Sequence, residues 1–238
     1  MNDWAPRKFW TDVTVRADGD GWSVYLDERP LRTPAKAALL APTSAMAEAV
    51  AGEWRAQDET IDPGTMPFTG SLNATLDKII PNPVPVADML AGYAETDLLC
   101  YRAGNPDALV VRQAETWDPF LDWAAETHDA RLVTTAGVMP GTQPADAVAK
   151  LARAVHDLDP YDLTAAHDLI TLSGSLILGL AAIAGQIDGE TLWSAARLDE
   201  SWQIEQWGPD EEAESLAATK KEAVLHAFAF QALAKKPA

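Results

Sequence analysis

The first forty residues alternate between apolar and polar positions with the two-residue period of a β-strand. Residues 9–15 and 22–26 show the clearest runs, and residues 31–40 hold a third run with room for a fourth. Residues 19–21 read as a loop between the first two runs. Residues 27–28 stand where a two-residue hairpin turn belongs. The pattern therefore predicts a small antiparallel sheet.

A helical period follows these strands. Met46, Val50 and Trp54 recur every four residues and so share one helix face, and Thr43 or Ser44 can cap the helix. Trp54 is then a core anchor that joins the helix to the sheet.

Most of the remaining chain has helical periodicity. The Pro/Gly-rich stretch at residues 61–70 separates it from the sheet region, so we place a domain boundary there. We expect an α+β protein with a small β-rich domain carrying one helix (1–68) and a larger, mainly helical domain (69–238), an orthogonal helical bundle. Helices are expected at residues 72–80, 86–99, 108–127, 145–158, 163–186, 189–207 and 210–234. Two short strands, 98–102 and 131–137, can pair with each other.

Residues 169–187 carry no charged side chain and approach the length of a bilayer span. Asp168 and Asp188 flank the stretch directly, and no cluster of Lys or Arg is present to set a membrane topology. A helix that is apolar on every side is also typical of the centre of a helical core. The pattern favours a fully buried helix.

Composition excludes several classes of partner and chemistry. The chain has 238 residues, 36 acidic against 18 basic, and a net charge of −18, which opposes binding to nucleic acid or anionic membranes. The single cysteine, Cys100, excludes an internal disulfide and a cysteine-based zinc site, and its apolar neighbours indicate a buried, inert thiol. Residues 1–10 lack the features of a signal or transit peptide, so a cytoplasmic location is expected.

The segment at residues 199–214, DESWQIEQWGPDEEAE, combines seven carboxylates, two tryptophans and two glutamines without a cation. An ordinary solvated helix face mixes its charges, since opposite signs three or four residues apart stabilise each other. Two interpretations stay open for this segment: core tryptophans beside solvated acids, or a surface that binds a basic or polar partner. Trp202 fits the core interpretation better than Trp207.

An enzymatic interpretation rests on three His-Asp dipeptides, at residues 128–129, 156–157 and 167–168. Helical phosphohydrolases hold divalent metals with such groups, because imidazole and carboxylate together suit these ions. Local roles compete with this hypothesis, since His128 and His156 fall near predicted helix C-termini. Phosphate-binding loops, nucleophile elbows and zinc-protease motifs are absent from the sequence.

Seven ordered blocks carry a resemblance to a known family. They are KFWTDVTV (8–15), LDERPLRTP (26–34), EWRAQ (53–57), IDPGTMPFT (61–69), YAETDLLCYRA (93–103), QAETWDPFLDW (113–123) and DESWQIEQWGPDEEAE (199–214). In this order they resemble the alphaproteobacterial branch of the assembly chaperones for the F1 head of ATP synthase, over about residues 7–230. Glu28 departs from the family pattern, in which glycine is expected in the hairpin turn.

The resemblance implies a chaperone without catalysis or cofactor that binds the ATP synthase alpha subunit. It further implies a cytoplasmic protein, with relatives in the mitochondrial matrix, and we expect a monomer. Partner contacts carried over from the family are Glu205, Gln206, Trp207, Asp210 and Glu212. The alternative function is a metal-dependent phosphohydrolase that uses the His-Asp pairs.

Overall fold

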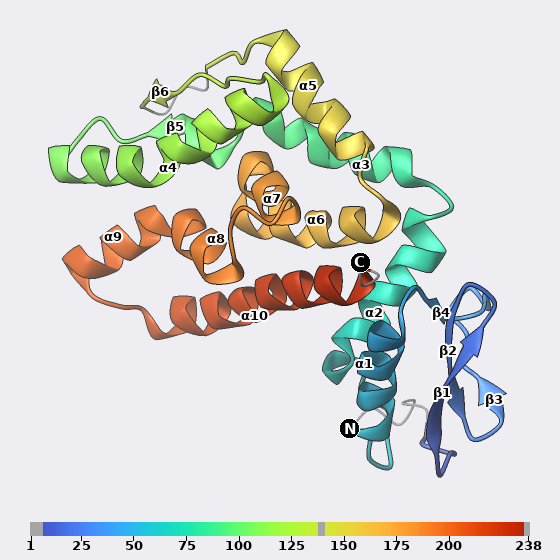
Figure 1. The fold of residues 1–238 in the computed structure, drawn as a ribbon. Helices are drawn as coiled ribbons and strands as arrows, with labels where there is room; N and C mark the ends of the chain where they lie inside the picture. Colours follow the sequence, from blue (N-terminus) through green and yellow to red (C-terminus); the bar gives the residue numbers. More distant parts are fainter. Residues whose placement is uncertain (1–6, 138–140, 236–238) are drawn as a thin grey trace. The chain divides into compact units, whose positions relative to one another are not determined.

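The computed structural model describes residues 7–137 and 141–235 (Figure 1). The chain forms two compact units, one of Met1–Asn82 with Ala229–Ala238 and one of Pro83–Phe228. The architecture is α+β, as predicted, with an antiparallel sheet near the N-terminus and helices through most of the rest. The first unit runs past the boundary expected at residue 68, and independent folding of two domains stays a prediction.

The first unit contains a four-stranded sheet followed by helices. Its elements are β1 (Val13–Asp18), β2 (Gly21–Leu26), β3 (Arg29–Pro30), β4 (Leu40–Ala41), α1 (Ser44–Arg55), the 3-10 helix η1 (Pro63–Thr65), α2 (Pro67–Ala74) and the π-helical turn η2 (Thr75–Ile79). Strand β2 pairs antiparallel with β1, β3 and β4. The third predicted strand is largely absent, because Pro34 has no N–H for a ladder, and residues 31–39 contain an isolated bridge instead.

The hairpin turn between β2 and β3 shows how the sequence manages without the expected glycine. Asp27, not Glu28, adopts the left-handed conformation, with a φ of 54°. Its carboxylate accepts hydrogen bonds from the backbone N–H groups of Thr11 and Asp12 at 3.0 and 2.9 Å. Aspartate is among the residues that tolerate this region, so Glu28 keeps an ordinary backbone and pairs with Arg16.

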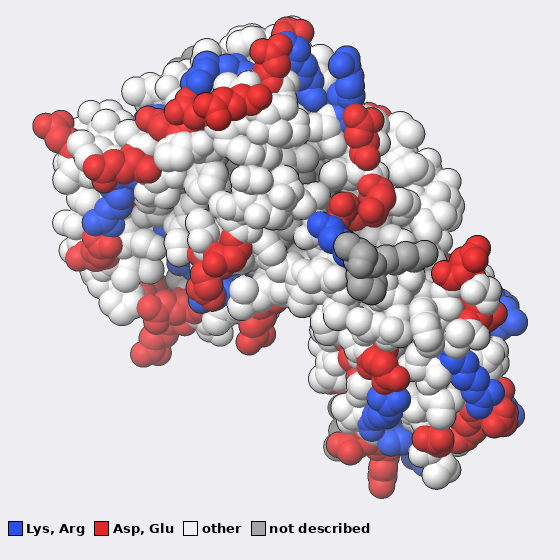
Figure 2. Space-filling model, in the orientation of Figure 1, with Lys and Arg blue, Asp and Glu red and all other residues white. Residues whose placement is uncertain are grey.

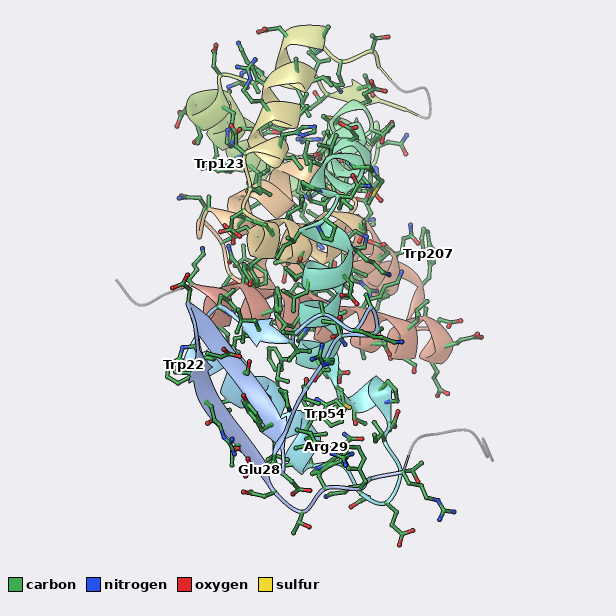
Figure 3. The ribbon with its side chains drawn as sticks, turned by 90° about the vertical axis from the view of Figure 1, so that its right-hand side faces the viewer. Trp22, Glu28, Arg29, Trp54, Trp123 and Trp207 are labelled. Carbon is green, nitrogen blue, oxygen red and sulfur yellow. The ribbon has the colours of Figure 1, made fainter. Side chains whose placement is uncertain are left out.

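Trp54 anchors α1 to the segment before the sheet. Thr43 caps the helix, as expected, and Met46 and Val50 are fully buried where α1 packs on β1 and β2. Trp54 is half-buried, and its ring meets the buried ring of Trp10 edge-on at 5.2 Å between centroids. Figure 3 marks Trp54 within the first unit.

The second unit is helical. Its elements are α3 (Pro83–Ala91), η3 (Gly92–Glu95), η4 (Leu98–Cys100), β5 (Tyr101–Arg102), α4 (Asp107–His128), β6 (Thr135–Ala136), α5 (Ala145–His156), α6 (Pro160–Ser173), α7 (Leu176–Ile183), α8 (Gly189–Ala196), α9 (Leu198–Trp207) and most of α10 (Glu211–Ala234). The predicted pairing of two short strands is confirmed, since β5 and β6 form a parallel pair. In α10, Val224 and Ala227 are buried, whereas Leu216 is exposed.

Three predicted helices are interrupted. Residues 86–99 form the end of α3 and the two 3-10 helices η3 and η4, and two further predicted helices are each broken into two. Gly174, with a φ of +72°, ends α6, and the Ser175 side chain caps α7, so residues 163–186 do not form one helix. Arg197 likewise separates α8 from α9. All residues of α7 are buried, and a Cβ at Gly179 would clash with Ile170 of α6. Within the described ranges, no helix is both long enough and apolar enough to cross a bilayer.

A buried carboxylate connects the start of α7 to η4. Asp97 has no exposed surface, and it accepts hydrogen bonds from the backbone N–H groups of Leu99 and Ile177, both at 3.0 Å. Burial raises the pKa of Asp97 to about 6, because the charged form loses its hydration, while the amide donors oppose this shift. The carboxylate thus satisfies buried backbone donors at an electrostatic cost.

Replacing Trp54 tests its role as an anchor. Trp54→Arg is expected to lower the free energy of unfolding by about 2 kcal/mol, since a charged, non-aromatic side chain loses the contact with Trp10. Trp54→Phe keeps an aromatic ring and is the matched control. Chemical denaturation monitored by circular dichroism measures both, and an unchanged midpoint for Trp54→Arg would refute the anchor.

Asp97 predicts a pH dependence of stability. Its folded pKa of about 6 lies above an unfolded value near ~4, so its contribution is fully present below pH ~4 and is lost as the pH rises through about 6. The unfolding free energy of the wild type, relative to Asp97→Asn, should therefore fall by on the order of 2 kcal/mol between pH 4 and pH 8. Denaturant titrations at several pH values measure the difference, and a pH-independent difference contradicts the assignment.

Candidate partner-binding surface

Helix α9 and the start of α10 bury few residues in the second unit. Of the residues of α9, all within the described part of the chain, Leu198 alone is buried, and residues 211–216 are all exposed. Gly208 ends α9 with a φ of +90°, and the Asp210 carboxylate accepts a hydrogen bond from the Ala213 N–H at 2.8 Å at the start of α10. This segment therefore offers its polar side chains to solvent.

The acidic segment forms an ion pair with a residue of α4. This residue is Arg112, which precedes its partner Glu205 by 93 positions in the sequence. The Arg112 guanidinium donates to both carboxylate oxygens of Glu205, at 2.7 and 2.9 Å, and lies 4.7 Å from the ring centroid of Trp202. The hydrogen bonds from Arg112 hold the pKa of Glu205 below its usual range, and they raise the pKa of Arg112. Glu205 therefore has a partner from outside the segment, which itself contains no cation. Trp202 is half-buried beneath the guanidinium rather than a core residue.

A second contact joins α4 to α9. The buried Gln113 side chain donates to the Asp199 carboxylate at 2.7 Å and accepts from the Ala103 N–H at 2.8 Å. One turn further along α4, the Trp117 indole donates to the Ala195 carbonyl at 2.8 Å. The Gln113 bond fixes α9 against α4 and gives Asp199 a structural role, whereas the Trp117 bond fixes α8 against α4.

Trp207 is the most exposed large apolar residue described, with 78% of its surface accessible. Its side chain stands out from the ribbon in Figure 3. It borders a cavity of about 500 Å³, which we call the tryptophan groove, lined by Asn105, Pro106, Leu109, Asp199, Trp202, Gln203, Gln206 and Trp207. Two of the five expected contact residues, Gln206 and Trp207, thus share one groove, whereas Glu205, Asp210 and Glu212 do not line it.

A larger cavity of about 860 Å³ lies along other residues of α9. Ser201 and Ile204 line it together with Phe120 and Trp193, whereas Gln203 and Gln206 line the tryptophan groove. The two cavities therefore use different faces of α9. Pro106, Leu109 and Arg112 were not predicted from the sequence, because nothing local shows that the start of α4 meets α9.

Most of the net negative charge lies in the second unit. Residues 83–228 hold 24 of the 36 acidic residues but only 8 of the 18 basic ones. In Figure 2 the carboxylates gather near the junction of α9 and α10. A cationic partner is therefore attracted to this unit before contact.

The His-Asp pairs do not converge. His156 bonds to Asp88 at 3.0 Å, His167 bonds to its neighbour Asp168 at 2.8 Å, and Asp129 pairs with Lys150. Burial lowers the pKa of His128, whose ring packs edge-on against Trp123. Among residues 7–137 and 141–235, no group of three or more His, Cys, Asp and Glu side chains could hold a metal ion.

The chain belongs to the ATP12 chaperone family. The family model, described as ATP12 chaperone protein, matches residues 7–125. The predicted family is thereby confirmed, and its members are chaperones.

Solved structures agree with this assignment. The chain is similar to Atp12 from Paracoccus denitrificans, at 50% identity and a TM-score of 0.91 over 96% of this chain and 98% of that chain. A mutant of P. denitrificans Atp12p gives the same identity and coverage with a TM-score of 0.92. A protein from Agrobacterium tumefaciens is 40% identical, with a TM-score of 0.87, over 96% of this chain and 85% of that chain.

Exchanging the charges of Arg112 and Glu205 tests whether their pair holds α9. Arg112→Glu should lower the melting temperature, because two carboxylates then meet beside Trp202, and the double variant with Glu205→Arg should recover most of the loss. The exposed pair Arg131–Asp122, exchanged in the same way, is the matched control. Thermal unfolding measures all variants, and failure of the double exchange to recover stability would show that the pair does not hold the helix.

Proposed function

We propose that this protein is an assembly chaperone for the F1 sector of ATP synthase, which binds the alpha subunit and shields its beta-facing surface until assembly. Membership of the ATP12 chaperone family supports the general role. The main observation that supports this binding site is the exposure of Trp207, 78% of whose surface is accessible, within a segment of seven carboxylates. The proposed contacts are Glu205, Gln206, Trp207, Asp210 and Glu212.

The composition of this surface suits a chaperone that must release its client. An isolated subunit exposes apolar surface that its neighbours would cover, and such patches aggregate. Trp207 supplies contact area, while carboxylates accelerate encounter with a cationic surface and add little to the final affinity. The client can therefore bind quickly and still yield to its true partner.

Glu200, Glu211, Glu212 and Glu214 support this proposal, because their side chains make no hydrogen bond or ion pair within the described residues. Asp210 caps α10 through one oxygen, which leaves the other oxygen for a client. Glu205 takes part as a member of the pair with Arg112. We place the protein in the bacterial cytoplasm as a monomer that uses no cofactor and performs no catalysis. No observation favours the alternative phosphohydrolase.

A binding and aggregation assay with purified ATP synthase alpha subunit from the same organism tests the proposal. The wild type should co-purify with the alpha subunit and suppress its light scattering at a near-stoichiometric ratio. Glu205→Lys and Asp210→Lys should slow association severalfold, with the difference shrinking at high salt. Absence of co-purification with the wild type would overturn the proposed function.

Two controls separate charge from folding. Asp210→Ser removes the charge but keeps a good helix cap, so it should also slow association while leaving the melting temperature unchanged. Glu126→Lys makes the same charge change as Glu205→Lys, but it lies about 20 Å along α4 from Arg112. Equal effects of Glu126→Lys and Glu205→Lys would mean that net charge alone acts.

A further inference from the structure

Helix α9 contains a complete arginine-binding arrangement made within the chain. The Trp202 ring lies under the Arg112 guanidinium, and Glu205, three residues later, binds the same group through two hydrogen bonds. The planar guanidinium suits both partners, since it stacks on an aromatic face and matches a carboxylate. This cluster therefore shows how an arginine is bound on this surface: its guanidinium stacks on a tryptophan ring and donates to a carboxylate.

Trp207 is the second tryptophan of this segment, and it has no cation of its own. The sequence also places a carboxylate, Asp210, three residues after it, although Gly208 ends the helix between the two. No Lys or Arg among residues 7–137 and 141–235 lies over the Trp207 ring, although six other rings in that part of the chain have such a contact. The exposed indole face is therefore available to a cation from outside the chain.

The tryptophan groove adds an apolar site beside this ring. Leu109 and Pro106 line it with the two tryptophans, and its polar lining consists of the amides of Asn105, Gln203 and Gln206 together with the Asp199 carboxylate. No basic residue belongs to that lining. A ligand with an aliphatic part and a positive charge thus matches the apolar and acidic residues that line the groove.

We propose that the tryptophan groove receives a client segment in which an arginine stacks on Trp207 and an adjacent aliphatic side chain enters beside Leu109 and Pro106. The proposal rests on the proposed function, because the client is taken to be the alpha subunit. A second copy of this chain is a poor occupant, since each copy carries a net charge of −18 and the groove has no basic lining.

Cysteine footprinting on the full chain tests the groove. Gln203→Cys places a thiol in the groove, and Ser201→Cys, two residues earlier on α9, places one in the other cavity. The native Cys100 does not interfere, because it is buried and burial raises its thiol pKa to about 12. With alpha subunit at ten times its dissociation constant, maleimide labelling of Gln203→Cys should slow about tenfold, and labelling of Ser201→Cys should change little.

Each other outcome of the footprint contradicts the proposal in a recognisable way. Bound alpha subunit without protection of Gln203→Cys places the client elsewhere and leaves the proposed function intact. Protection in the chaperone alone, increasing with its concentration, identifies a second copy as the occupant. If the wild type binds no alpha subunit, the proposed function and the client of the groove are both wrong.

Substitutions at Trp207 test the arginine itself. Trp207→Leu keeps apolar surface but has no aromatic face, so it should weaken alpha-subunit binding about two- to fivefold more than Trp207→Phe does. Trp207 is exposed, so neither change should alter the melting temperature. Equal affinities of the two variants would show that no cation stacks on this ring.

Discussion

The second unit depends on hydrogen-bond acceptors for the backbone N–H groups at the start of a buried helix. Helix α7 is buried along its whole length, so its first N–H groups must find acceptors within the protein. Ser175 and Asp97 supply them, and Asp97 also bonds to the N–H of Leu99 in η4. Asparagine, which has the same size, has one acceptor oxygen where Asp97 uses two, so the chain retains a carboxyl group where its charged form is unfavourable. The helices α4, α6 and α8 then pack around α7.

Helix α4 connects this core to α9, on which the proposed client surface lies. Its Trp117 bonds to α8, and Gln113 and Arg112 bond to α9, so successive turns of α4 position both helices. Only Leu198 of α9 is buried, among residues that are all described. Polar contacts thus determine where α9 lies, and its remaining side chains are exposed or half-buried. A surface built in this way is defined in space without being apolar enough to aggregate by itself.

The sequence predicts most helices and strands well, but it predicts poorly which of them contact each other. Periodicity located α1, α4, α5 and α10, and the ordered motifs identified the family. The predicted helix at residues 163–186 does not include the break between α6 and α7, because hydrophobicity is continuous there. Gly174 followed by Ser175 is nevertheless a recognisable helix stop and cap. The pair of Arg112 and Glu205 is different in kind. It joins residues 93 positions apart, and local patterns contain no information about such pairs. The segment 199–214 was found, but the groove beside it was not.

Helix α10 has a consequence for the order in which the protein is made. Its residues up to Phe228 belong to the second unit, and those from Ala229 belong to the first, where Thr43 donates a hydrogen bond to the Leu233 carbonyl. The first unit is therefore discontinuous in the sequence. During synthesis, residues 1–82 are translated before the helices of the second unit. The hydrogen-bond acceptor of Thr43, which caps α1, is translated about 190 residues after it. The chaperone thus completes its N-terminal unit only after the helices that follow have been synthesised.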